Sequence, residues 1–171
     1  MSKFTHLHVH SHYSLLQALP KISDLVNKAK EDNMSALALT DAGNLYGAIE
    51  FYKECKNFNI KPIIGVDFYV AARTRTDREP RIDNKRTRLV LLVKNAVGYQ
   101  NLIQLVTLSN LEGFYYKPRL DRELIEKYSE GLVAISPAWG GDISTALRNS
   151  NEEKAEDWAD FLAKTFKDDF I

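Results

Sequence analysis

The chain has 171 residues, enough for one domain with its own core, and its 44% hydrophobic and 27% charged residues are typical of globular proteins. Basic and acidic residues each number 23, so the net charge is zero and a whole-molecule attraction to DNA or an anionic membrane is excluded. The single cysteine, Cys55, excludes an intramolecular disulfide, and no apolar run approaches the roughly 20 residues that span a bilayer. We therefore expect a cytoplasmic protein.

Short apolar runs alternate with amphipathic stretches five times along the chain. The runs predict strands at residues 7–10, 36–40, 62–70, 89–93 and 132–136. Helical spacing predicts helices that begin at Pro20 and near Asn151, and others over residues 45–58, 99–111 and 122–128. We expect Gly65 to bend its strand. Apolar strands separated by helices indicate a parallel sheet covered by helices, and this pattern leaves both a doubly wound sheet and a barrel open.

Chemistry in either architecture belongs at the carboxyl ends of the strands. Those ends present His10, Asp41, Asp67, Lys94 and Ser136. No glycine-rich phosphate loop follows any predicted strand, so a dinucleotide or P-loop site is weakly supported. Phe170 and Ile171 look like the start of a further strand, and we expect the chain to be part of a longer protein.

All four histidines, His6, His8, His10 and His12, alternate along the first predicted strand. Residues two apart in a strand share a face, which predicts that the four imidazoles project from one side. This spacing lets two imidazoles reach one cation such as Zn or Mn, whereas the alternative is a polar strand face satisfied by hydrogen bonds. Two histidines do not complete a site, because a catalytic metal typically needs about three protein ligands and an open position.

Several motifs resemble one known family. They are HVHSHYSLL at residues 8–16, ALALTDAGNLYG at 36–47, IKPIIG at 60–65, GFYYKPR at 113–119 and YSEGL at 128–132. Together they are similar to the PHP (polymerase and histidinol phosphatase) domain, and more closely to the branch at the N-terminus of bacterial DNA polymerase III alpha subunits. The resemblance implies an α/β fold, a distorted seven-stranded β/α barrel that is truncated here after about five βα units, with residues 1–171 forming the N-terminal part of a single domain. Polymerase palm, thumb and fingers would lie outside this chain.

The resemblance also implies a metal cluster at the strand ends, and this chain departs from its pattern. His8 and His10 match the first ligand pair, and Asp67 stands where the family has Glu. The other family ligand positions hold Gln17, Ala42, Arg88 and Ala138. Alanine offers no donor, and arginine carries a permanent positive charge that repels a cation. We therefore expect a vestigial metal site of His8, His10 and Asp67 with at most weakly bound Zn or Mn, and no catalytic residue.

Two functional hypotheses follow from this resemblance. The first is a structural and partner-binding part of a replicative DNA polymerase, a nucleotidyltransferase with Mg in its own polymerase site. Its implied partners are DNA, for the parent protein, and the proofreading exonuclease subunit. The second is a metal-dependent phosphoesterase, similar to a pyrophosphatase or a 3′–5′ exonuclease, that uses a reduced metal centre.

Two charged regions lie within the neutral chain. Residues 73–88, the basic segment, hold seven basic and three acidic side chains, and Arg75 and Arg78 are candidates for sequence-independent contact with nucleic-acid phosphates. The alternative is a solvated loop. Residues 142–171 hold eight acidic and four basic side chains, which predicts the solvated face of a helix whose Trp158, Phe161, Leu162 and Phe166 pack in the core. Apolar surface left uncovered in a truncated barrel predicts self-association.

Overall fold

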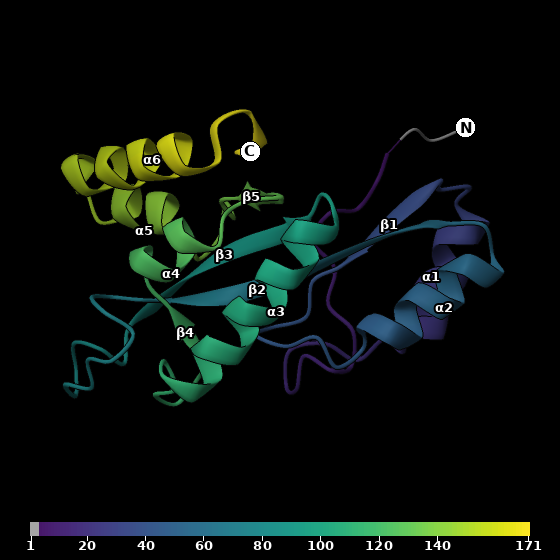
Figure 1. Ribbon diagram of the computed structural model, residues 1–171, viewed down its shortest axis with the longest axis horizontal. Helices are drawn as coiled ribbons and strands as arrows, with labels where there is room; N and C mark the ends of the chain where they lie inside the picture. The colour runs from purple at the N-terminus through teal and green to yellow at the C-terminus, as the bar shows by residue number, and fades with distance from the viewer. Residues whose placement is uncertain (1–3) are drawn as a thin grey trace. The chain divides into compact units, whose positions relative to one another are not determined.

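The computed structural model describes residues 4–171 and divides the chain into two compact units, one ending at Asp67 and one spanning Phe68–Ile171 (Figure 1). The strand β2 (Lys61–Ala71) runs from the first unit into the second. Strand pairings follow the order β1-β2-β3-β5, and β4 also pairs with β2. No helix in residues 4–171 is long and apolar enough to cross a membrane.

The first unit is built on a parallel pair of strands. It contains α1 (Ile22–Glu31), β1 (Ala36–Leu39), α2 (Ala48–Asn57) and the first half of β2. β1 pairs with β2 from Ala36 opposite Lys61 to Leu39 opposite Ile64. The helices α1 and α2 pack side by side (Figure 1), and their apolar faces share one core cluster with the strands. This arrangement confirms the helix predicted to begin near Pro20.

Cys55 lies in this core and is completely buried. Burial raises the pKa of its thiol to about 12, because a thiolate would lose its hydration there. The side chain therefore packs as a small hydrophobic group. The bend expected at Gly65 is wrong, since β2 continues through this residue as regular strand.

The second unit combines parallel and antiparallel pairing. Its elements after β2 are β3 (Arg86–Val93), α3 (Ala96–Leu111), β4 (Arg119–Leu120), α4 (Arg122–Lys127), β5 (Leu132–Ile135), α5 (Asp142–Arg148), α6 (Glu152–Phe166) and the 3-10 helix η1 (Lys167–Asp169). β4 is parallel to β2, but β5 runs antiparallel to β3, with Val90 opposite Ile135 and Val93 opposite Leu132. The prediction of a purely parallel sheet is therefore wrong at β5. Periodicity reports which residues are buried, but it carries no information on strand direction.

The C-terminal residues pair with β5 as a further strand would. Phe170 forms a parallel bridge with Ala134, and the amide of Ile171 donates to the Ala134 carbonyl at 2.9 Å. In α6, Trp158, Leu162 and Phe166 are buried as predicted. The side chain of Asn151 caps this helix by accepting from the amide of Lys154 at 3.0 Å.

Three elements of the second unit were not predicted, namely β4, α5 and η1. The strand β4 has only two residues, too few for a visible period, and α5 has seven.

A close approach between Gly98 and Gly131 fixes the start of α3. A Cβ on Gly98 would lie 1.8 Å from the carbonyl oxygen of Gly131, and Gly131 itself has a φ of +73°. Only glycine fits at both of these positions.

Candidate metal centre and its surroundings

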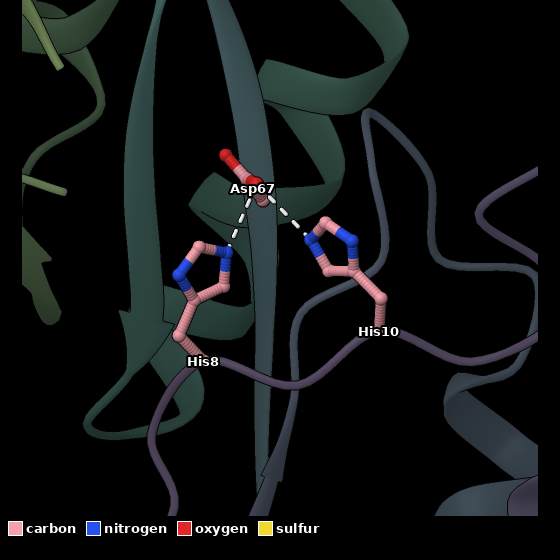
Figure 2. Close-up of side chains that lie close together, drawn as sticks. All are labelled: His8, His10 and Asp67. Atoms are coloured by element: carbon pink, nitrogen blue, oxygen red, sulfur yellow. Dashed lines mark hydrogen bonds and ion pairs between the residues drawn. The ribbon is translucent and has the colours of Figure 1, made fainter. Parts of the chain in front are cut away.

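His8, His10 and Asp67 form one cluster, hereafter the histidine–aspartate cluster (Figure 2). The Nε2 atoms of both imidazoles lie 3.0 Å from the same carboxylate oxygen, Oδ2 of Asp67. One ligand atom from each residue lies within 4.8 Å of the others. The Asp67 side chain is only 3% exposed, whereas His8 is 40% and His10 20% exposed. The carboxylate is thus buried, while both imidazoles are partly exposed to solvent.

The histidines lie on an extended segment that is not a regular strand. The amide of Ala38 donates to the carbonyl of His6, and the amide of Thr40 donates to the carbonyl of Val9. The two acceptors are three positions apart in the sequence, but the two donors are only two positions apart, so the pairing shifts by one residue between them. At this shift, the hydroxyl of Thr40 takes the place of a backbone acceptor, because it accepts from the amide of Val9 at 2.9 Å. The strand predicted at residues 7–10 is therefore wrong, because a side chain replaces part of the backbone ladder.

The same irregularity separates the four imidazoles. His6 is exposed and packs edge-on against Phe4 at 4.8 Å between ring centroids. His12 is half-buried and stacks on Tyr13 at 4.3 Å, with its buried Nδ1 lacking a hydrogen-bond partner in the described chain. Only His8 and His10 reach Asp67, so the prediction of one shared face holds for two histidines of four.

Asp41, which is 2% exposed, fixes the turn that follows His10. Its Oδ1 accepts from the amide of Ser11 at 2.7 Å and from the hydroxyl of Ser14 at 2.6 Å, and its Oδ2 accepts from the hydroxyl of Ser11 at 2.7 Å. The hydroxyl of Ser14 in turn accepts from the amide of Ala42 at 3.0 Å. Asp41 therefore organises the loop. The sequence placed this residue correctly at a strand end but gave no sign of its role.

Asp67 is placed by backbone pairing just beyond the β1–β2 ladder. Its amide donates to the carbonyl of Asp41 at 3.1 Å, and its carbonyl accepts from the amide of Gly43 at 3.0 Å. Ala42 forms the bridge opposite Asp67. Ala42, where the resemblance implies a histidine in other members, thus lies directly beside the buried carboxylate and contributes only a methyl group. Within residues 4–67, no fourth histidine, cysteine or carboxylate donor joins the cluster.

The other three departures from the family pattern are Gln17, Ala138 and Arg88. Gln17 is exposed on the loop before α1, and Ala138 is exposed on the loop before α5. In the second unit, the Arg88 guanidinium lies 4.2 Å from the centre of the Tyr69 ring, and its amide donates to the carbonyl of Gly140 at 2.8 Å.

The donor set of the histidine–aspartate cluster fits a transition-metal ion. Two imidazoles and a carboxylate are ligands that Zn and Mn accept. Donors about 2.1 Å from a tetrahedral ion lie about 3.4 Å from one another, so the 3.0 Å separations need only a small expansion. Three protein ligands are the minimum usually found at a catalytic zinc. The cluster can therefore hold an ion, with no protein ligand in reserve.

The two arginines predicted to contact nucleic acid differ in their surroundings. Arg75 is only 15% exposed and pairs with Glu112 at 2.6 Å, Asp121 at 3.0 Å and Glu123 at 2.9 Å. Arg78 is exposed, and it makes no ion pair within residues 4–171. Phosphate binding by Arg75 would require it to leave these carboxylates, so Arg78 is the more accessible candidate.

A buried arginine that the sequence analysis missed anchors the basic segment. Arg119 is fully buried, and its guanidinium donates to backbone carbonyl oxygens at 2.7 to 3.0 Å. The acceptors are Gly113, Asp83, Arg75 and Asp77. Burial lowers the pKa of Arg119, because the charge is removed from water. Its only sequence signal was its place in the GFYYKPR motif.

A second carboxylate of interest is Asp142, at the start of α5. It is 8% exposed, and its Oδ2 accepts from the hydroxyl of Thr87 at 2.6 Å. Burial raises the pKa of Asp142 to about 6, against the opposing effects of the Thr87 hydrogen bond and the charges of Lys154 and Arg122. The sequence analysis counted this residue only as one acid in an acidic region.

The sequence profile of the PHP domain family matches residues 6–171. DNA polymerase III subunit alpha of Borreliella burgdorferi is 48% identical over 170 residues, which cover 99% of this chain and 15% of that protein. The subunit of the same name from Aquifex aeolicus is 45% identical over 178 residues, again covering 99% of this chain and 15% of the relative. The chain thus spans about a seventh of the length of these relatives.

A solved structure supports the fold. A protein of Bifidobacterium adolescentis, described as a candidate metal-dependent phosphoesterase, superposes with a TM-score of 0.56 at 9% sequence identity. The match covers 96% of this chain and 85% of that one. At this identity the likeness concerns the fold alone, and it extends across both units of the chain.

Proposed function

The chain belongs to the PHP domain family, and from this premise we propose that it is the N-terminal part of such a domain in a replicative DNA polymerase alpha subunit, where it has a structural or partner-binding role. Polymerase III alpha subunits at 45–48% identity over nearly the whole chain support this parentage. In this proposal, nucleotidyl transfer and its Mg belong to the remaining length of the parent protein, which also carries the DNA contact.

The observation that carries the proposed role is the pairing of Ala42 with Asp67. A methyl group stands at a ligand position of the family, directly beside the buried carboxylate. Three donors remain within the first unit, and Asp67 already receives hydrogen bonds from both imidazoles. These bonds join the N-terminal segment to β2. They support the proposed structural role of the cluster.

The partner we propose is the proofreading exonuclease subunit of the polymerase core. A pull-down of the purified exonuclease subunit by the chain tests this role. Binding that survives in His8→Ala and His10→Ala supports a surface independent of the cluster. Failure of the correctly folded wild-type chain to retain the exonuclease subunit removes the partner role.

A second candidate function rests on the convergence of three donors with solvent-exposed imidazoles. In this alternative, His8, His10 and Asp67 hold Zn or Mn for hydrolysis of a phosphate ester, as in a pyrophosphatase or a 3′–5′ exonuclease. A bound ion would supply Lewis-acid stabilisation and a water of lowered pKa. The buried Asp67 would fix one ligand, and the exposed edges of the imidazoles would leave the substrate side open.

Metal analysis combined with hydrolysis of bis(p-nitrophenyl) phosphate in Zn and Mn separates the two functions. We expect substoichiometric metal after dialysis and no turnover above background. His6→Ala is the matched control, because His6 lies on the same segment outside the cluster. Stoichiometric metal with turnover that His8→Ala and His10→Ala abolish, and His6→Ala retains, would establish the phosphoesterase instead.

A further inference from the structure

The second unit contains a hollow of about 710 Å³. The end of β2, the first residues of β3, the helix α5 and the start of α6 line it. Its charged lining consists of Lys85, Arg86, Arg88, Lys154 and Asp142. We call this feature the basic hollow, because four cations face one carboxylate.

Three of the four cations of the basic hollow have no carboxylate partner in the part of the chain that the structure describes. Lys85, Arg86 and Lys154 are exposed, and none of the three makes an ion pair within residues 4–171. In contrast, Arg73 pairs with Asp83 at 2.6 Å and with Glu79 at 3.1 Å. Carboxylates therefore surround Arg73, whereas Lys85 and Arg86 have none as ion-pair partners within residues 4–171.

Aromatic and backbone contacts hold the two arginines at the hollow. The guanidinium carbons of Arg86 and Arg88 lie 5.6 and 4.2 Å from the centre of the Tyr69 ring. Arg86 also donates from Nη1 to the carbonyl of Asn84 at 2.9 Å. Such contacts restrict the side chains before any ligand arrives, which lowers the entropic cost of binding.

The single carboxylate changes the charge of the hollow with pH. The Asp142 carboxyl is buried with a pKa near 6, and its Oδ2 already accepts from the Thr87 hydroxyl. The lysine and arginine side chains named above are the other charged groups that face the hollow, and Arg122 also acts on Asp142. Protonation of Asp142 therefore removes the one carboxylate charge among the described lining residues and makes the hollow more positive.

From this arrangement we propose that the basic hollow is a binding site for a phosphate group. Guanidinium and ammonium groups are the side chains that bind phosphate oxygens with charge-assisted hydrogen bonds, and the Asn and Thr side chains of the lining add neutral polar groups. The phosphate has two possible sources, a free anion and the backbone of a nucleic acid. The proposal needs neither a metal nor the histidine–aspartate cluster.

Titration of the 171-residue chain with inorganic phosphate and with fluorescein-labelled oligothymidylate tests the site. Calorimetry follows the phosphate, and anisotropy follows the oligonucleotide. The double variant Arg86→Gln with Lys154→Met removes two exposed cations of the hollow, and we expect it to weaken binding about tenfold or more. Lys127→Gln with Lys164→Met is the matched control, because both residues are exposed and lie outside the hollow. The control should change binding less than about twofold.

The two probes distinguish the sources of the phosphate. Binding of both, with displacement of oligothymidylate by inorganic phosphate, supports a site open to either source, whereas binding of one alone identifies that source. Asp142→Asn should tighten binding severalfold at neutral pH and have little effect below the pKa of Asp142. Absence of binding by both probes overturns the proposal, as does equal weakening in the hollow variant and its charge-matched control.

Discussion

Two buried carboxylates, Asp41 in the first unit and Asp142 in the second, show how differently one side chain can be used. Asp41 lies just beyond β1 and Asp142 is the first residue of α5, and both are at most 8% exposed. Asp41 accepts three hydrogen bonds of 2.6 to 2.7 Å from Ser11 and Ser14. Asp142 accepts one, from Thr87. The number of donors around the carboxylate, rather than its burial, separates the two sites.

The difference has consequences for what each region does. The donors around Asp41 compensate its lost hydration, so the carboxylate holds together the turn that follows His10. Asp142 lacks this compensation, and its pKa rises to about 6 as a result. The first region is therefore a fixed scaffold for two imidazoles. The second has a charge that changes in a physiological pH range.

The largest effect should come from Asp41→Ala, which leaves the Ser11 amide and two serine hydroxyls without their buried acceptor. Each stranded donor costs about 1–3 kcal/mol, so we expect the free energy of unfolding to fall by about 3–5 kcal/mol. Urea denaturation followed by circular dichroism measures this change. Asp41→Asn is the control, because its amide oxygen can still accept and its loss should be smaller.

A loss below about 1 kcal/mol in Asp41→Ala would contradict the role assigned to this carboxylate. Water would then be replacing the carboxylate as acceptor, and Asp41 would not differ in kind from Asp142. The proposed difference between the surroundings of Asp41 and Asp142 would then be wrong.

The sequence predicted most elements of the first unit and the three residues of the candidate metal site. Apolar spacing predicted α1 and β1 within a few residues, because burial of Ile22, Val26 and Ala29 is periodic. Alternation failed at residues 7–10, where the Thr40 hydroxyl replaces a backbone partner. The sequence therefore predicted that His8, His10 and Asp67 lie together. It did not predict that His6 and His12 have other surroundings.

In the second unit, the positions of the elements were better predicted than the strand pairing and the ion pairs between them. The residues of β5 were predicted within one position, but its antiparallel pairing with β3 was not. Likewise, the excess charge of the basic segment was visible in the sequence, whereas the three carboxylates around Arg75 were not, because they come from residues at least 37 positions away. Whether Arg75 or Arg78 contacts nucleic acid stays a prediction.

The second largest effect should come from Asp142→Asn. The carboxyl is held near a pKa of 6 when folded, against about 3.9 when unfolded, so the folded state binds the extra proton between these values. Stability should then fall as pH rises from about 4 to 6 and stay level above. The asparagine variant should lack this fall and gain about 2–3 kcal/mol at neutral pH.

Urea denaturation of both proteins at a series of pH values measures that difference. Asp168→Asn, at an exposed acidic position of η1, is the control for a general loss of negative charge. An Asp142→Asn variant that keeps the wild-type pH profile would show that Asp142 has the same pKa in both states, and the contrast with Asp41 would disappear.

Thr87→Ala should have the smallest effect and the most specific one. The hydroxyl of Thr87 is the one side-chain hydrogen bond that lowers the pKa of Asp142, so its removal should raise this pKa further. The free energy of unfolding should fall by about 1 kcal/mol at neutral pH and by less in acid, where the carboxyl is protonated.

Carbon-detected NMR titration of the Asp142 carboxyl measures the pKa directly. Thr145→Ala is the control, because Thr145 lines the same hollow without a hydrogen bond to Asp142. A titration midpoint that is unchanged in Thr87→Ala, or equally raised in Thr145→Ala, would mean that general burial alone sets the charge of Asp142 and that donor number does not distinguish it from Asp41.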